Sequence, residues 1–348
     1  MTAAPTVILS HALPPADSPE MHAALANLPL PFVRSWLQSS VAQRTITTAA
    51  EDLALPQELA LAQSLGWSTA PGSWPWAALA AHARSQGADG ATQHALLAES
   101  TRARIQDNAC GPVLNADEAT PAWAFIHLCH WQVGNGQFTL LDTGPISEAE
   151  SAALLASMRT YFEEDGITLH PFEPGRWLAQ SALFDGLASA SAARVMGLPI
   201  EPWLLGAHLP ELPPAIRTLR RLQNEMQMLL YQHPVNDARR IPLNSIWIEG
   251  CGRLGGDTPA PAPGAPSAIT LDDLREPWLL RDASGWARTW ERLDAEVLPA
   301  WLHPAGARIA WCGQRQARWW IHQQPTTWQR LQRAVRPIQP AEVLSCDA

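Results

Sequence analysis

The sequence contains no lysine: all 24 of its Lys and Arg positions are arginine. The absence excludes a Schiff-base lysine, the lysine of a phosphate-binding P-loop and the lysine of a protein kinase. The lysine of a Ser–Lys hydrolase is excluded as well. Codon bias is the ordinary cause of such an absence, but the chemical consequence holds regardless of the cause.

Cysteine is scarce, and long apolar runs are absent. The five cysteines are Cys110, Cys129, Cys251, Cys312 and Cys346, which lie far apart and form no Cys-x-x-Cys pair. This pattern predicts neither a disulfide framework nor a zinc ribbon, and it fits a reducing compartment. No apolar run approaches the roughly 18 residues that a membrane span needs. The N-terminal MTAAPTVILSHALPP lacks the charge and apolar length of a signal peptide. We therefore expect a cytoplasmic protein with no membrane partner.

The charge of the chain is uneven. The net charge is −9, yet residues 297–341 hold six arginines, five tryptophans and no Asp or Glu. Arginines on phosphates and tryptophans stacked on bases would suit single-stranded nucleic acid. The acidity of the whole chain and the expected burial of most tryptophans disfavour nucleic acid as a partner. A protein partner for this tail stays open.

Short apolar runs alternate with helical periodicity, which is typical of an α/β protein. TVILS (6–10) predicts a first strand, and residues 20–108 are rich in Ala and Leu with helical spacing. Within residues 120–182 two strand pairs flank a helix, which Ser147 and Glu150 begin as a capping box. The first pair, 122–133 and 137–142, is joined by a Gly-Asn-Gly hairpin turn.

The remaining elements follow in order. We expect a helix over 213–232 that Pro234 stops, a strand over 244–249, a helix over 285–302, a strand over 307–313 and a helix over 326–335. The chain then divides into a helix-rich N-terminal part of the core (1–118), a small α+β unit (119–182), a helix with a following motif (183–254), a Pro/Ala linker (255–268) and a C-terminal helix–strand–helix part of the core (269–348).

The stretch HPVNDARRIPLNSIWIEGCGRL (233–254) carries the strongest site signal. Asparagine amides can bind polar ligand atoms, an arginine fork suits carboxylate or phosphate, and glycine amides after a strand can form an anion nest. The ligand-binding residues predicted here are His233, Asn236, Arg239, Asn244, Gly250 and Gly252. A corner between a helix and a strand, tied by asparagine side chains, is the structural alternative.

The same stretch resembles a known family. RLQNEMQMLLYQHPVNDARRIPLNSIWIEGCGRL, CHWQVGNGQFTLLD and YFEEDGITLHPFEPGRWLAQ look like members of a proteobacterial family of phosphoglycerate-mutase-like, RpfE-type regulatory proteins. The resemblance covers most of residues 50–254. More distantly, the block is similar to archaeal-type cofactor-independent phosphoglycerate mutases of the alkaline phosphatase superfamily. The resemblance implies an alkaline-phosphatase-like mixed sheet flanked by helices, with a smaller α+β unit inserted.

The resemblance also implies which groups catalysis would need. That superfamily uses two divalent metals, ligands after the first strand, and an Asp-His pair at the end of a late strand. Here SHALPP follows the first strand with no aspartate before Asp17, and the late strand ends in Cys312-Gly313-Gln314-Arg315. We therefore predict no catalytic residues and no metal ligands. Mn²⁺ or Mg²⁺ would be required only if the enzyme were active.

Glu249 departs from the family pattern, because an uncharged residue usually precedes the Gly-x-Gly. A carboxylate beside an anion nest repels phosphate unless Arg239 or Arg253 neutralises it. Three hypotheses follow. The preferred one is a regulatory protein that binds a small anion and has lost metal-dependent catalysis. The others are an active phosphoglycerate mutase or phosphatase with unrecognised metal ligands, and a protein- or nucleic-acid-interaction module that uses the tail.

Overall fold

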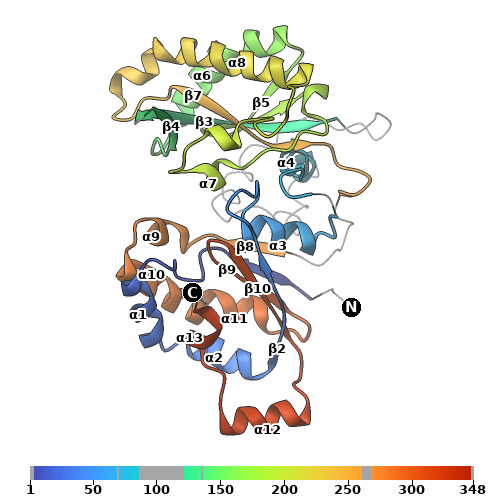
Figure 1. Cartoon of the computed structure of the whole chain (residues 1–348), viewed down its shortest axis with the longest axis vertical. Coiled ribbons are helices and arrows are strands. Elements are labelled where there is room, and N and C mark those ends of the chain that lie inside the picture. The colour runs from blue at the N-terminus through green and yellow to red at the C-terminus, as the bar shows by residue number, and fades with distance from the viewer. Residues whose placement is uncertain (1–3, 69, 86–120, 135, 261–267, 346–348) are drawn as a thin grey trace.

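Two five-stranded sheets, one above the other, form the framework of the protein (Figure 1). The computed structural model describes residues 4–68, 70–85, 121–134, 136–260 and 268–345. The lower sheet contains both the first strand of the chain and the last ones. The upper sheet is built from the middle of the sequence, so the chain leaves the lower sheet, completes the upper one and returns.

The lower sheet has the strand order β2-β10-β9-β1-β8. Its strands are β1 (Thr6–Leu9), β2 (Ser40–Thr47), β8 (Ala268–Leu271), β9 (Arg308–Cys312) and β10 (Gln316–His322). β1 is parallel to β8 and β9, whereas β10 runs antiparallel to β9 and β2. All four residues of β1 are buried, as expected for a central parallel strand covered on both faces.

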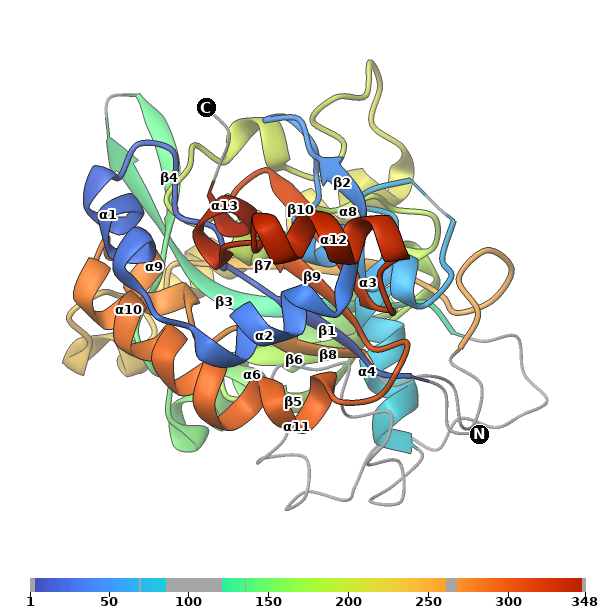
Figure 2. The same cartoon turned by 90° about the horizontal axis from the view of Figure 1, so that it is seen from below.

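Most helices of the lower half cover one face of this sheet, as the view from below shows (Figure 2). They are α1 (Pro19–Asn27), α2 (Pro31–Gln38), α9 (Arg275–Leu279), α10 (Ala283–Arg292), a π-helical turn (Leu293–Val297), α11 (Leu298–Leu302) and α13 (Pro340–Leu344). α12 (Thr327–Val335) has no buried residue and projects below the lower half (Figure 1). Trp286, Trp290 and Trp311 are fully buried in this core. α3 (Pro56–Ser64) covers the opposite face, toward the upper half.

The upper sheet is antiparallel throughout. Its strands are β3 (Trp123–Gly134), β4 (Gln137–Leu141), β5 (Thr168–Glu173), β6 (Arg176–Gln180) and β7 (Ser245–Gly252), with the order β4-β3-β6-β5 and β7 paired with β3. The predicted strand pairs 122–133/137–142 and 167–180 are confirmed, although Asn135 of the hairpin turn lies outside the described residues. β7 joins this sheet from about 65 residues further along the chain.

Helices α6 (Glu148–Glu164) and α8 (Pro214–Tyr231) cover the upper face of that sheet, and α4 (Trp76–Ser85) covers the lower face (Figure 1). The predicted capping box is present: Ser147 Oγ accepts the Glu150 N–H at 3.2 Å, and Glu150 accepts the Ser147 N–H at 2.8 Å. Smaller elements are α7 (Ala192–Val195) and the 3₁₀ turns Ala182–Phe184, Glu201–Trp203 and Pro234–Ala238.

The α/β class, with mixed sheets flanked by helices, is confirmed. Three strands were not predicted: β2 lies in the stretch expected to be helical, β8 begins at the end of the expected linker, and β10 follows the late strand. Residues 86–108 of the expected helical stretch and 261–267 of the linker lie outside the described residues. No helix in the described part of the chain combines the length and apolarity needed to cross a membrane.

Candidate functional site

The predicted site begins at the corner between α8 and β7, and Asn236 ties this corner together. Its Nδ2 donates to the carbonyls of Leu230 and Leu243, both at 2.8 Å, and its Oδ1 accepts the Leu243 N–H at 2.7 Å. Three polar atoms of the main chain thus depend on one side chain. The end of α8 and the start of β7 are held together without any contribution from a ligand.

Arg239 and Asn244 are engaged in the same way. Arg239 donates to Glu150 Oε1 at 2.8 Å and to the Thr143 carbonyl at 2.7 Å, and its side chain is only 8% exposed. Asn244 accepts the N–H of Trp131 at 2.7 Å and donates to the Trp131 carbonyl at 3.0 Å. These contacts occupy the groups that the sequence suggested for an anion. Their ligand-binding role stays a prediction.

His233 caps the 3₁₀ turn that follows α8. Its Nδ1 accepts the Val235 N–H at 3.3 Å, and its Nε2 lies 3.0 Å from the Ser157 hydroxyl on α6. The ring therefore links the corner to α6. The two glycines of the motif lie at the other end of β7.

Gly250 and Gly252 allow β7 to approach α4 closely. Both have positive φ angles, +64° and +131°. A Cβ on Gly250 would lie 3.1 Å from Trp76 Cβ and 3.2 Å from the Ala77 nitrogen, and a Cβ on Gly252 would lie 3.2 Å from Pro75 Cβ. Close packing therefore explains why glycine occupies both positions, in addition to the predicted anion nest.

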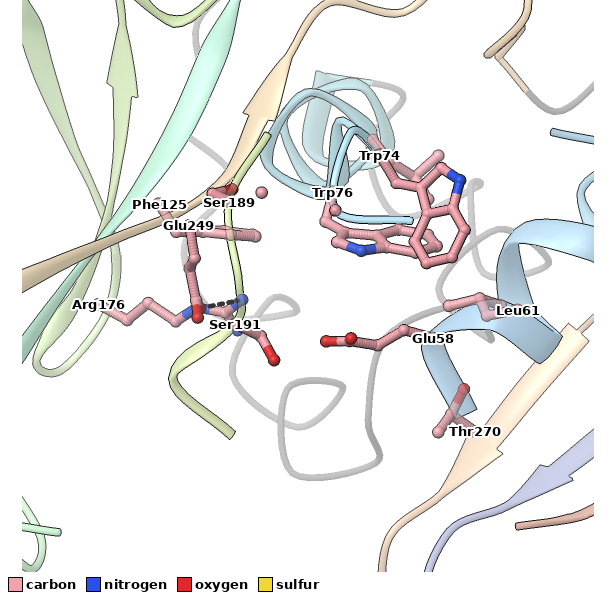
Figure 3. A pocket seen from close by; sticks show the side chains of 13 residues that line it. Glu58, Leu61, Trp74, Trp76, Phe125, Arg176, Ser189, Ser191, Glu249 and Thr270 are labelled. Carbon is pink, nitrogen blue, oxygen red and sulfur yellow. Dashed lines mark ion pairs between the residues drawn. The ribbon is translucent and has the colours of Figure 1, made fainter. Parts of the chain in front are cut away.

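A pocket opens beside Gly250, between α3 of the lower half and α4, β3 and β7 of the upper half (Figure 3). Its volume is about 230 Å³. The lining residues are Glu58, Leu61, Gly72, Trp74, Trp76, Leu79, Phe125, Arg176, Ser189, Ser191, Glu249, Gly250 and Thr270. A second, more polar cavity of about 610 Å³ shares Glu58, Arg176, Ser191 and Glu249 with it and reaches Asp272 and Arg275. Of the predicted site residues, Gly250 alone lines the first pocket.

Glu249 and Arg176 form one wall of the pocket. Glu249 Oε1 lies 3.1 Å from Arg176 Nη2, and Glu249 Oε2 accepts the Ala192 N–H. Arg176 also lies over the Phe125 ring, 3.6 Å from its centroid. The predicted neutralising partners were wrong, because Arg239 pairs with Glu150 and Arg253 pairs with Asp185. Strand pairing explains the difference, since β3 holds β6 and β7 on either side and brings Arg176 to Glu249.

Glu58 forms the opposite wall, at the first turn of α3. Its Oε2 accepts the Leu55 N–H at 2.7 Å, so it caps the helix. Burial raises the pKa of this carboxyl to about 7, while hydrogen bonds with Ser191 and Leu55 and the charge of Arg194 partly offset the effect. Glu58 and Ser191 point toward each other across the pocket (Figure 3). A carboxyl with this pKa changes its charge near neutral pH.

Three buried polar atoms of the lining have no hydrogen-bond partner among the described residues. They are Trp74 Nε1, Thr270 Oγ1 and Arg176 Nε. Trp74 is 3% exposed. Buried polar groups are usually hydrogen-bonded, and an exception calls for an explanation such as a bound molecule. The pocket thus differs from the corner, where Asn236, Arg239 and Asn244 all have partners.

The ends of β1, β8 and β9 lie where the resemblance implies metal ligands. His11 Nδ1 is 3.4 Å from Asp272 Oδ1, so one imidazole and one carboxylate meet there. β9 ends in buried Cys312, whose thiol pKa is raised by burial, and Gly313 follows it. Among the described residues, no group of three or more His, Cys, Asp or Glu side chains could hold a metal ion.

The pocket could not be assembled from sequence. Glu58 looked like one residue of an amphipathic helix, and Trp74 and Trp76 lay in a stretch with Pro-Gly and Pro-Trp breaks. Arg176 was predicted only as part of a strand pair, with no sign that it would lie beside Glu249. The one local signal was Glu249, whose charge before the Gly-x-Gly departed from the family pattern.

Comparison with known proteins finds distant similarity. No protein-family model and no curated protein matches the sequence. Among solved structures, a cofactor-independent phosphoglycerate mutase from Thermoplasma acidophilum DSM 1728 is similar at 12% identity and a TM-score of 0.32, over 93% of this chain and 90% of that one. The PH0037 protein from Pyrococcus horikoshii is similar at 11% identity and a TM-score of 0.45, over 92% of this chain and 88% of that one. Neither likeness assigns an activity to this chain.

Proposed function

We propose that this protein binds a small molecule between its two halves and performs no metal-dependent phosphoryl transfer. On this view it is a phosphoglycerate-mutase-like protein of the RpfE-type regulatory kind, which has kept ligand binding and lost catalysis. The proposal keeps the binding role and the loss of catalysis expected from the sequence, but it does not keep the small anion as ligand, and it moves the binding site. The site is the pocket beside Gly250 rather than the corner around Asn236.

The packing at the end of β9 is the observation that carries the proposal. A Cβ on Gly313 would lie 2.8 Å from Leu13 Cβ, so an aspartate or histidine side chain has no room at this position without movement. The N–H groups of Ala12 and Leu13 both donate to the Cys312 carbonyl, at 2.7 and 3.3 Å. The loop after β1 therefore lies directly on the strand end where the resemblance implies metal ligands.

Two tryptophans hold this loop in place. Trp278 Nε1 donates to the Leu13 carbonyl at 2.9 Å, and Trp286 Nε1 donates to the His11 carbonyl at 3.0 Å. Both indoles are buried in the core of the lower half. The covering of the strand end is thus part of the hydrophobic core, and a small shift of one side chain would not open it.

The test combines metal analysis with assays on the purified full chain. We expect less than stoichiometric Mn²⁺ or Mg²⁺ after dialysis, and no phosphoglycerate mutase or phosphatase turnover with either metal added. Stoichiometric metal together with turnover that a chelator abolishes would overturn the proposal.

The active-enzyme alternative has one specific feature in its favour, the meeting of His11 and Asp272 at the strand ends. If turnover were found, it should disappear in the Asp272→Asn variant. Asp237→Asn is the matched control, since Asp237 lies on the 3₁₀ turn after α8, at the corner. Loss of turnover in the first variant alone would show that activity depends on Asp272.

A further inference from the structure

The lining of the pocket identifies the kind of ligand it accepts. We propose that the pocket binds a small organic cation: a protonated amine or amidine carried on an apolar or aromatic body, with the cation beside Glu58. This inference rests on the proposed function, because it names the ligand class of the same pocket.

The apolar side of the pocket is aromatic. Trp74 and Trp76 have ring centroids 5.7 Å apart, and Trp67 lies behind Trp76 at 4.8 Å. Both pocket tryptophans lie on the same side of the cavity, across from Glu58 (Figure 3). Tryptophan faces attract cations and also pack against flat apolar groups. A ligand with an apolar body and a positive end would meet both kinds of surface here.

Glu58 is the carboxylate left for a ligand. Glu249 is neutralised by Arg176 and also accepts the Ala192 N–H. No Arg or His lies within salt-bridge distance of Glu58 among the described residues. Arg194, the cation that affects Glu58 most, lies over the Trp203 ring at 4.2 Å and donates to the Asp52 carbonyl at 3.0 Å. A bound cation would therefore be the nearest counter-charge of Glu58.

The same charges disfavour an anionic ligand. Two carboxylates, Glu58 and Glu249, face one cavity, and the one guanidinium in its lining is already paired. A phosphate or carboxylate placed there would meet Glu58, and the charge of Arg176 is already balanced by Glu249, although Arg176 Nε has no hydrogen-bond partner among the described residues. The unpartnered Trp74 Nε1–H and the Thr270 hydroxyl are neutral groups, so they could bind an acceptor atom on the ligand body without changing this balance.

Burial of Glu58 links binding to pH. Its pKa is raised to about 7, chiefly by burial. A cation binds the ionised carboxylate, so its affinity should rise with pH through about 7 and then level off. The charged groups nearest Glu58 are Glu249, Arg176 and Arg194. The titratable and charged groups further along the adjoining cavity are His127, Asp142, Glu173, Asp272 and Arg275.

The experiment compares three probes that share one body: 2-phenylethylamine, the neutral 2-phenylethanol and the anionic 3-phenylpropionate. Titration calorimetry on the full chain at pH 8 gives the three affinities. We expect the amine to bind at least about tenfold more tightly than the alcohol, because the amine gains a charge-assisted hydrogen bond to Glu58. The carboxylate should bind weakest, because Glu58 repels it. From pH 8 to pH 6 the amine should lose about tenfold in affinity, as the fraction of ionised Glu58 falls.

Variants locate the effect. Glu58→Gln should lower the affinity for the amine to that of the alcohol and abolish its dependence on pH. Glu225→Gln is the matched control, because Glu225 is a surface partner of Arg221 on α8, and it should bind like the wild type. Urea denaturation checks that both variants are folded.

The outcomes separate this inference from the proposed function. Tighter binding of the carboxylate than of the amine, binding of the amine unchanged in Glu58→Gln, or no binding of any probe would each overturn the cation assignment. None of these results would establish catalysis. Chelator-sensitive turnover would instead overturn the proposed function and leave a preference for amines measurable by the same titrations.

Discussion

The two ends of β7 carry opposite kinds of polar chemistry. At its start, Asn236, Arg239 and Asn244 have their hydrogen bonds satisfied by the protein itself. At its end, Glu58 and the indole of Trp74 face a cavity, and the indole N–H has no partner among the described residues. The side chains of the first region hold the chain together, and we propose that the second region binds a ligand. The stretch 233–254 therefore runs from this corner to the edge of the pocket.

Asn236→Ala should destabilise the corner between α8 and β7 and leave the pocket unchanged. It would remove three hydrogen bonds and leave main-chain groups of Leu230 and Leu243 without partners. We expect a loss of about 3 kcal/mol in the free energy of unfolding. Urea denaturation gives this value, and calorimetry at low temperature should give an unchanged affinity for 2-phenylethylamine.

Asn27→Ala is the control for that change. Asn27 is exposed at the end of α1 and makes one hydrogen bond, to the Ala23 carbonyl at 2.9 Å. Its loss should cost less than about 0.5 kcal/mol. If both variants lost the same stability, the corner would not have the structural role assigned to it.

Gly250→Ala should affect both regions, since Gly250 lies where the motif meets the pocket. Its φ of +64° is unfavourable for alanine, and the new Cβ would press on Trp76 and Ala77. We expect a loss of about 2 to 3 kcal/mol of stability from strain and overpacking together. Amine affinity should also fall, because Trp76 would be displaced.

Gly136→Ala separates strain from packing. Gly136 has a similar φ of +77°, but nothing lies within 4 Å of the position of its Cβ. We expect a loss of about 1 kcal/mol, from backbone strain alone. Equal losses in the two variants would show that the close approach of α4 to β7 contributes nothing.

Local patterns predicted the elements that local forces determine. The capping box of Ser147 and Glu150 and the stop at Pro234 depend on a few neighbouring residues, and the helices α6 and α8 follow from them. β8 is different: it has four residues, follows a Pro/Ala-rich stretch and is defined by parallel pairing with β1, about 260 positions away. β2 is an edge strand with mostly exposed side chains, so it lacks the apolar run that marks a strand.

The ligand-binding role of the candidate site at 233–252 stays a prediction, for a related reason. The residue types at 233–252 predicted contacts with a ligand. Asn236, Arg239 and Asn244 form hydrogen bonds with main-chain groups and with the Glu150 carboxylate. Residue type alone does not distinguish a hydrogen bond to the main chain from one to a ligand. The pocket requires α3, α4 and β7 together, and their packing follows from the whole fold.

Ser147→Ala tests how the stability of the protein depends on pH through Glu150, the partner of Arg239. Hydrogen bonds from Ser147, and then from Arg239, lower the pKa of Glu150 to about 2. Because an unfolded glutamate has a pKa of about 4.3, this contribution to stability is present above pH 4.3 and is lost as the pH falls toward 2. We expect the variant to lose about 1 kcal/mol at pH 7 and less at pH 2.5, measured by urea denaturation.

Thr326→Ala is the matched control, because Thr326 forms a capping box with Gln329, which does not titrate. Its loss of stability should be the same at both pH values. A loss that fell with pH in both variants would mean that the titration of Glu150 is not the cause.

Glu58→Gln should have the smallest effect on stability and the opposite sign. The folded pKa of Glu58, about 7, lies above that of an unfolded glutamate, so its contribution is present below pH 4.3 and is lost as the pH rises through 7. Glutamine can still accept the Leu55 N–H. The variant should therefore gain stability over the wild type between pH 4.3 and 7, by no more than about 1 kcal/mol because the pocket is open to solvent. Excess 2-phenylethylamine at pH 8 should reverse this order, since the ligand stabilises the wild type alone. A variant less stable than the wild type at pH 8 without ligand would mean that Glu58 serves the fold, as Asn236 does, and the contrast between the two ends of β7 would fail.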